Sequence, residues 1–277
     1  MLAIPMMNVL SFDVEEWFDV YHSKIKGDYK AKRVNIGIEK IVSLLRTENV
    51  KATFFILAKL AEENGEVVKI IEKAGHEIAT HGYAHKLISS QNHKEFEKDL
   101  LLSIKILKNI SGKEILGYRA PGYSLTKDTL WALDIIKDCG LKYDSSIYPV
   151  SLRLFTHGGI AGYPQGPFLI KGEFVEFPLP TLNLLGLKFP VATTAYFRFF
   201  PYWLTKYAIT RLNNKNITPT LNFHSWEFDE NHPKIKLPFP QNIKHYYNLA
   251  QTEERFKKLL GDFKFVTCQE ALKNILS

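Results

Sequence analysis

HEIATHGYAH, residues 76–85, is the stretch that decides how this chain is interpreted, because a strand-like apolar pattern runs there into two histidines. His81 and His85 lie four residues apart, and side chains with that spacing share one face of a helical turn. Two neutral imidazoles placed in this way can bind one divalent metal ion. The chain contains nine His, so such a pair arises readily by chance and needs support from elsewhere in the sequence.

Three further segments place polar side chains directly after an apolar, strand-like run. They are MNVLSFDVEEWF (7–18), YRAPGY (118–123) and PTLNFHSWEF (219–228). The first ends in a cluster of carboxylates that begins at Asp13, the second carries Arg119 and the third carries His224. Together, these segments and the HEIATHGYAH stretch supply two His, an acidic cluster, an Arg and a third His, and carboxylates at a strand end are typical of a functional site.

Strand-like segments alternate along the chain with segments of helical periodicity. Apolar residues at one-turn spacing predict helices around residues 38–45 and 96–107, and Gly112 is a typical stop signal after the second. The strand-like runs are residues 7–13, 51–57, 76–79, 115–119, 174–177, 219–223 and 263–266. This alternation predicts a parallel sheet, and in a βα barrel the active site lies at the carboxyl ends of the strands.

Five segments in this order resemble the motifs of polysaccharide deacetylases with the NodB homology domain, carbohydrate esterase family 4: SFDVEEWF, HGYAH, YRAPGY, YDSSIYP and NFHSWEF. The later segments YFRFFPYWLT and KHYYNLAQTEERFKKLL resemble the subgroup found beside exopolysaccharide gene clusters. The resemblance implies a distorted, incomplete (β/α) barrel of α/β class. It also implies one deacetylase-like domain over residues 1–277, with 178–250 as a family-specific insertion or C-terminal part.

The family resemblance implies a metal held by His81, His85 and a carboxylate. Most family members begin with two adjacent aspartates, whereas Asp13 is followed here by Val14. Because side chains alternate across a strand, Glu15 returns to the side of Asp13 and is the predicted ligand, with Glu16 as the alternative. If neither binds, the site is weaker or metal-free, as in imide-hydrolysing relatives.

The resemblance also assigns roles in amide hydrolysis, for which zinc is the expected metal. Asp13 is expected to take the proton of the attacking water, His224 to protonate the leaving nitrogen, and Arg119 to pair with Asp13. A backbone N–H at Gly122 or Tyr123 is expected to stabilise the oxyanion. The remaining predicted site residues are Tyr123 and Trp226 as substrate contacts and Glu176 as a carboxylate that tunes the pKa of His224.

The composition is that of a soluble globular protein, with 45% apolar and 23% charged residues. Cys139 and Cys268 lie far apart, so no disulfide framework is predicted. The chain start lacks a basic region and leads directly into the Asp13 segment, so we predict no signal peptide and a cytoplasmic location. The formal net charge of +7 accompanies lysines scattered over helical faces, and no Arg-rich run indicates nucleic-acid binding.

The leading prediction is a metal-dependent enzyme that removes N-acetyl groups from acetamido-sugars of a polysaccharide or its lipid-linked precursor. One alternative is an amidohydrolase that opens a cyclic imide or an allantoin-like ring, and another is a non-catalytic glycan-binding relative. The segment 196–207, YFRFFPYWLTKY, is rich in aromatics. Core packing explains such a segment, and so does an aromatic rim for sugars or for peripheral contact with a membrane.

Overall fold

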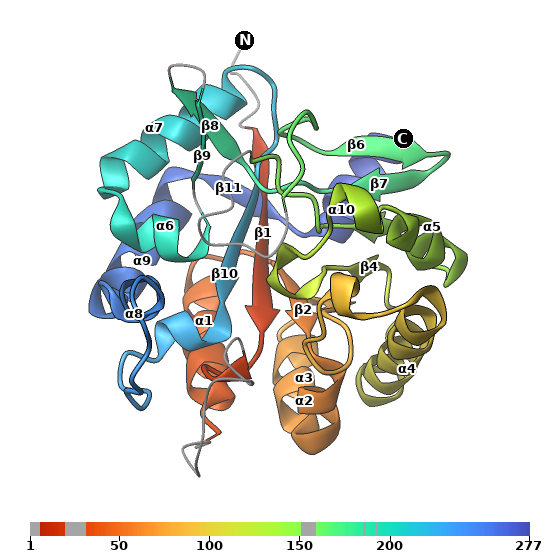
Figure 1. Ribbon diagram of the computed structural model, residues 1–277. Coiled ribbons are helices and arrows are strands. Elements are labelled where there is room, and N and C mark those ends of the chain that lie inside the picture. Colours follow the sequence, from red (N-terminus) through yellow and green to blue (C-terminus); the bar gives the residue numbers. More distant parts are fainter. Residues whose placement is uncertain (1–5, 20–31, 151–158, 185–186, 192) are drawn as a thin grey trace.

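The computed structural model describes residues 6–19, 32–150, 159–184, 187–191 and 193–277 of the chain. Within these residues, nine strands form one curled sheet in the order β10-β1-β2-β3-β4-β5-β7-β6, with β11 also paired to β1. All pairs are parallel except β6 with β7. β1 lies in the middle of the molecule, and helices surround the sheet (Figure 1). The predicted distorted, incomplete (β/α) barrel is confirmed.

The strands of this sheet are β1 (Met7–Val14), β2 (Thr53–Ile56), β3 (Glu77–Thr80), β4 (Gly117–Tyr118), β5 (Tyr143–Asp144), β6 (Phe168–Lys171), β7 (Phe174–Glu176), β10 (Thr220–His224) and β11 (Lys264–Val266). A separate hairpin consists of β8 (Thr181–Leu184) and β9 (Leu187–Pro190). The helices are α1 (Val34–Thr47), α2 (Ala58–Glu63), α3 (Gly65–Lys73), α4 (His93–Ser111), α5 (Trp131–Asp138), α6 (Thr194–Phe199), α7 (Tyr202–Asn213), α8 (Gln241–Tyr246), α9 (Thr252–Asp262) and α10 (Cys268–Leu276).

Side-chain alternation along β1 directs its residues alternately to the two faces of the sheet, which pack in different core clusters. Leu10, Phe12 and Val14 belong to the large core cluster that also contains residues of α1. Val9 belongs to a second buried cluster, which includes residues of α10. Since Asp13 has the parity of Val9, it lies on the face of β1 opposite the core against α1.

The parallel register brings the carboxyl ends of several strands to one edge of the sheet. Asp13 at the end of β1 pairs with His224 at the end of β10, and Thr80 at the end of β3 pairs with Tyr118 at the end of β4. The residues that follow β3 and β4 are His81 and Arg119. Segments up to 211 residues apart in sequence therefore meet at this edge.

The sequence patterns predicted seven strands of the sheet and missed others. β5 and the hairpin β8–β9 were not predicted, nor was β6, whose burial alternates only weakly. Within residues 178–250, β10 pairs with β1 and belongs to the main sheet. The division of the chain into a single domain with a family-specific part stays a proposal.

Both cysteines are free, as the sequence predicts. Among the helices that the structure describes, none combines the length and the apolar character needed to cross a membrane.

Candidate metal centre and acid–base site

Glu15, His81 and His85 form the one group of potential metal ligands found among the described residues, with their ligand atoms within 4.8 Å of one another. Glu15 follows β1 directly, and both histidines follow β3. Glu15 Oε2 lies 3.0 Å from His85 Nε2 and 4.0 Å from His81 Nε2. The structure therefore brings together the three residues that the sequence predicts as ligands.

The local reason for the histidine pairing differs from the predicted one. Residues 81–87 form a loop and not a helical turn. Gly82 and His85 both have positive φ, +76° and +55°, and these two residues turn the chain so that His85 folds back beside His81. His81 Nδ1 lies 2.8 Å from the carbonyl oxygen of Arg119, a contact that directs Nε2 toward the site.

Glu15 and Glu16 have different surroundings. Glu15 is fully buried, and its backbone is held by Ser225, whose hydroxyl accepts from Glu15 N and donates to Glu15 O. Glu16 instead accepts hydrogen bonds from the backbone N–H groups of Arg33 and Val34 at the start of α1. Glu16 therefore caps the N-terminus of α1, whereas Glu15 is the carboxylate that lies beside His81 and His85.

The donor set fits a divalent metal ion. Glu15 Oε2 is buried and forms no well-oriented hydrogen bond although His85 Nε2 is near, which leaves it available as a ligand. Burial alone would raise the pKa of Glu15, but the imidazoles of His85 and His224 lower it below its usual value. An ionised carboxylate with two imidazoles is a common ligand set for catalytic divalent metals.

Asp13 is held in a buried network beside this centre. Its Oδ1 accepts from Arg119 Nη1 at 2.9 Å, and its Oδ2 accepts from Asn222 Nδ2 at 2.9 Å. Arg119 is itself fully buried, donates to the carbonyl and hydroxyl oxygens of Ser145 and lies over the ring of Phe55. The pairing of Arg119 with Asp13, which the resemblance implies, is present.

His224 lies between two sets of carboxylates, with Asp13 and Glu15 near its Nε2 and Glu227 at its Nδ1. Its Nε2 is 3.9 Å from Asp13 Oδ2 and 3.5 Å from Glu15 Oε1. Its Nδ1 lies 2.9 Å from Glu227 Oε1, whose other oxygen accepts from Arg198 Nε at 2.8 Å. Burial lowers the pKa of His224, but Glu15 and Glu227 outweigh burial and raise it above its usual value.

The carboxylate that contacts His224 is Glu227 and not Glu176, which the sequence analysis predicted. Glu176 ends β7, accepts from the backbone N–H of Ile147 and lies beside Asp144 of the neighbouring strand. The carboxylate on the imidazole of His224 is Glu227, three residues further along the same segment. A short 3-10 turn, Ser225–Phe228, bends the chain so that Glu227 faces back toward His224.

The two predicted substrate contacts are largely buried. Trp226 stacks on His224 and His245, and its Nε1 donates to Glu15 Oε1 at 3.3 Å, so the indole forms a wall that supports the ligands. The hydroxyl of Tyr123 accepts from Asn222. The backbone N–H of Tyr123 donates to the carbonyl oxygen of Ala120, so it is already engaged within the turn.

Several site residues were missed by the sequence analysis: Asn222, Glu227, Arg198, Ser145 and His245. Glu227 and Asn222 lie inside the quoted motif around His224, so their position in that motif was an available signal. Arg198 also lies inside a quoted segment, YFRFFPYWLT, but nothing in that segment indicates that it reaches Glu227 from α6. His22 and His157, to which no role was assigned, lie outside the described residues.

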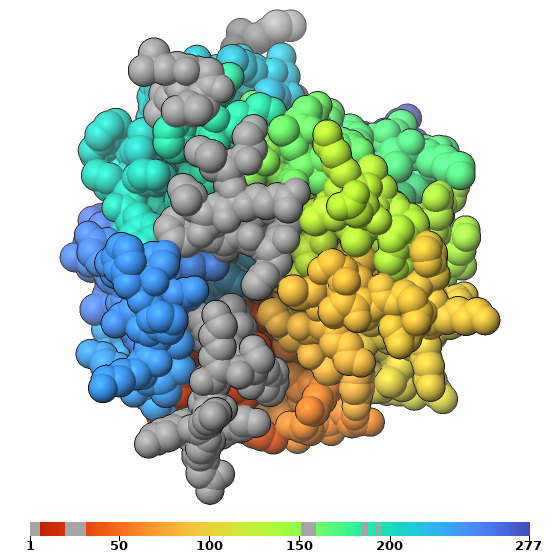
Figure 2. All heavy atoms as spheres, viewed as in Figure 1, coloured from red at the N-terminus to blue at the C-terminus, as the bar shows by residue number. Residues whose placement is uncertain are grey.

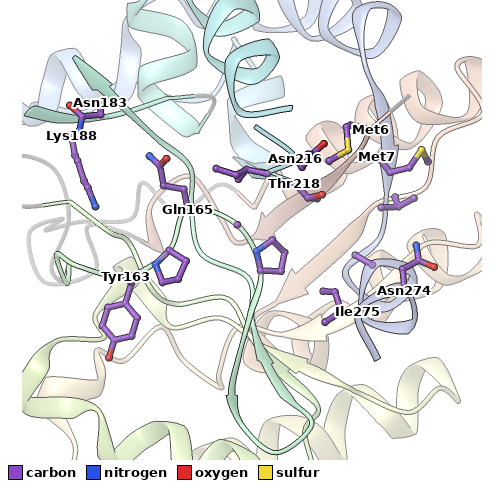
Figure 3. Close-up of a pocket in the computed structure, with 16 residues that line it drawn as sticks. Met6, Met7, Tyr163, Gln165, Asn183, Lys188, Asn216, Thr218, Asn274 and Ile275 are labelled. Carbon is purple, nitrogen blue, oxygen red and sulfur yellow. The ribbon is translucent and has the colours of Figure 1, made fainter. Parts of the chain in front are cut away.

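Figure 2 shows the blue surface around α8 and the orange and yellow surface of the segments that follow β2 and β3 on either side of the same face. A cavity of about 870 Å³ lies elsewhere, at the opposite end of β1, beside Met7, Gln165, Asn183, Lys188 and Asn274 (Figure 3). None of the described residues that line it is a His, Asp or Glu. Acid–base and metal chemistry is therefore placed at the Asp13 end.

Comparisons with known proteins agree with this geometry. Residues 30–143 match the family model for polysaccharide deacetylase, and residues 145–273 match a domain of unknown function, DUF3473. Peptidoglycan-N-acetylglucosamine deacetylase of Bacillus cereus is 30% identical over 201 residues, which cover 62% of this chain and 71% of that protein. Peptidoglycan deacetylase of Helicobacter pylori is 32% identical over 112 residues, 40% of this chain and 37% of that protein.

Solved structures show the same fold. A protein from Mycobacterium smegmatis assigned as a polysaccharide deacetylase superposes with a TM-score of 0.66 at 18% identity, covering 99% of this chain and 92% of that one. The sequence match to the Bacillus enzyme, at 30% identity, covers 71% of that enzyme. The chain therefore belongs to the polysaccharide deacetylase family, carbohydrate esterase family 4 with the NodB homology domain.

Proposed function

We propose that this protein is a zinc-dependent hydrolase that removes N-acetyl groups from acetamido-sugars of a polysaccharide or of its lipid-linked precursor. The proposal is supported by one observation above all: the group Glu15, His81 and His85 lies beside a carboxylate and an imidazole. These are Asp13, which can accept a proton, and His224, which can donate one. The names of the curated relatives support a deacetylase of acetylated glycans. The match to DUF3473 is consistent with the exopolysaccharide subgroup.

The residues divide the work of amide hydrolysis between them. Zinc held by Glu15, His81 and His85 would supply Lewis-acid activation of water and of the acetyl carbonyl. Asp13, oriented by Arg119 and Asn222, accepts the proton of the attacking water. His224, charged beside Glu227, donates a proton to the departing nitrogen. The N–H of Gly122 is the candidate donor to the oxyanion.

Release of acetate tests this function. Purified protein incubated with a panel of acetamido-sugar oligosaccharides and zinc should release acetate and expose free amines. Asp13→Asn and His224→Ala should each lower the rate by about 10² to 10⁴, since each removes one proton transfer. Consumption of a cyclic imide without acetate release would favour the amidohydrolase alternative, and absence of any turnover with zinc bound would favour a glycan-binding role.

Metal titration tests the ligand set independently of turnover. Glu15→Gln should weaken zinc binding by about 10- to 100-fold because a neutral amide replaces an ionised ligand, and His81→Ala should lose it. Glu16→Gln is the matched control, because Glu16 contacts the start of α1 and not the histidines. Weaker binding in the Glu16 variant alone would show that the wrong carboxylate has been assigned.

A further inference from the structure

Two lines of exposed apolar side chains occupy one flank of the molecule. On α7, Trp203 and Tyr207 lie one helical turn apart, and Trp203 is 66% exposed. Phe239, Ile243 and Tyr247 repeat at the same spacing along α8 and its flanking residues, and Phe239 is 80% exposed. Large apolar side chains rarely remain this exposed in one region unless it serves as a contact surface.

The two helices that carry these lines are linked through α6. The rings of Phe199, at the end of α6, and Tyr247 lie 5.3 Å apart. Arg198 donates to the carbonyl oxygens of Lys244 and Tyr247, so α6 is tied to α8, and α7 follows α6 after a two-residue corner. Figure 1 shows α6, α7 and α8 on the same side of the sheet, opposite α4 and α5.

The charges around this flank are predominantly positive. Residues 196–248 contain seven basic and three acidic residues, whereas the whole chain contains 36 and 29. Two of the three acidic residues, Glu227 and Asp229, are buried in ion pairs. The exposed charges of the segment include Arg211, Lys215, Lys234, Lys236 and Glu230, so the surface carries excess positive charge.

Aromatic side chains among exposed cations are the residue types that bind the interface of an anionic bilayer. Trp and Tyr place an apolar ring and a polar group at the headgroup level, and each nearby Lys or Arg adds attraction to anionic lipids. We propose that the α7–α8 flank, defined by Trp203, Tyr207, Phe239, Ile243 and Tyr247, docks this protein on a membrane surface that contains anionic lipid.

Docking on this flank would place the candidate site next to the bilayer. On the inner side of α8, His245 stacks on Trp226, which stacks on His224. The helix that carries Ile243 to the surface is thus also a wall of the site. This consequence rests on the proposed function, because it favours a glycan attached to a lipid as substrate, whereas docking itself is measured without turnover.

Vesicle sedimentation tests the proposal. The full chain is mixed at low salt with vesicles of phosphatidylglycerol and phosphatidylcholine in equal parts, or of phosphatidylcholine alone. We expect binding to the anionic vesicles, weakening with added salt, and little binding to phosphatidylcholine alone. The double variant Trp203→Ala with Phe239→Ala should lower the partition coefficient by about tenfold or more. Arg211→Glu should lower binding to the anionic vesicles without removing an apolar side chain.

The matched control is Leu101→Ala with Leu102→Ala, which removes two exposed apolar side chains from α4 on the other flank and should leave vesicle binding unchanged. His81→Ala should lose metal and still bind vesicles, while the Trp203 and Phe239 variant should keep metal and acetate release from a soluble oligosaccharide. Equal binding to both vesicle types, equal loss in the α4 control, binding to polysaccharide in place of vesicles, or a dimer that dissociates on Trp203→Ala would each overturn the proposal.

Discussion

At the scale of single residues, the buried charged groups around His224 are paired with one another. Arg198, Glu227 and His224 form a chain of contacts in which the guanidinium pairs with the carboxylate and the carboxylate orients the imidazole. Arg198 and Glu227 are at most 1% exposed. Such a buried arrangement holds the ring rigidly, because breaking one contact leaves an uncompensated charge.

Glu227→Gln should lower the turnover number of acetate release by about 10- to 100-fold with little change in KM or zinc content. The amide keeps a hydrogen-bond acceptor for the imidazole but loses the negative charge that favours its protonated form. Steady-state kinetics with metal analysis and circular dichroism check this expectation. Glu230→Gln, an exposed neighbour, is the control, and wild-type turnover in Glu227→Gln would contradict the assigned role.

Glu176 and Asp144 predict a pH dependence of stability. Burial raises the pKa of Asp144 to about 6 and that of Glu176 well above its ordinary value, with Asp144 adding to the second shift. The folded state therefore keeps protons that the unfolded chain releases above about pH 4.3, and the free energy of unfolding falls as the pH rises through the folded pKa values.

Glu176→Gln should match the wild type in stability near pH 4.5 and exceed it at pH 8, because the uncharged amide loses no proton. Urea unfolding at several pH values measures the difference. Glu173→Gln, exposed and three residues earlier, should show no such trend. A stability difference for Glu176→Gln that is constant with pH would refute the raised pKa.

At the scale of elements, the position of the site depends on how closely α1 approaches the turn Ser225–Phe228. A Cβ added at Gly37 of α1 would lie 2.0 Å from the carbonyl oxygen of Ser225. Ser225 in turn holds the backbone of Glu15 and follows His224. Because Gly37 has no side chain, α1 can pack closely against the turn that follows His224 and holds the backbone of Glu15.

Gly37→Ala should destabilise the protein by about 1 to 3 kcal/mol and weaken zinc binding, since the clash is with backbone atoms that cannot rotate away. Thermal unfolding and zinc titration provide the two measurements. Gly261→Ala in α9 is the control, because no atom lies within 4 Å of the added Cβ, and it should be neutral or slightly stabilising. Normal zinc affinity in Gly37→Ala would mean that the turn adjusts without moving Glu15.

At the scale of the whole molecule, the main sheet contains strands from both regions that match family models. β1, which precedes the first matched region, pairs with β2 of that region and with β10 and β11 of the second, and β5 pairs with β7 across the boundary near residue 144. His81 and His85 lie in the first matched region and Glu15 precedes it, but Ser225 and Trp226, which hold Glu15, lie in the second.

We therefore expect the full chain to unfold in one cooperative transition and residues 1–144 alone not to fold. Without β10 and β11, the fragment would expose one edge of β1 and lose the packing against Phe223 and Phe256. Circular dichroism during urea unfolding tests both statements. A fragment that unfolds cooperatively at the midpoint of the full chain would show two independent domains.

The sequence by itself determined the fold class, the order of the strands that carry the site and the choice of Glu15 over Glu16, because apolar periodicity and side-chain alternation are local properties of the chain. The sequence could not identify Glu227 as the partner of His224 or Arg198 as the ion-pair partner of Glu227. It also could not predict the loop that brings His85 beside His81. These depend on register, on backbone turns at positive φ and on contacts between segments 29 to 211 residues apart, such as Arg198 with Glu227 and Glu15 with Trp226. Only the tertiary structure decides such contacts, because many polar side chains could satisfy each buried charge and the packing selects one.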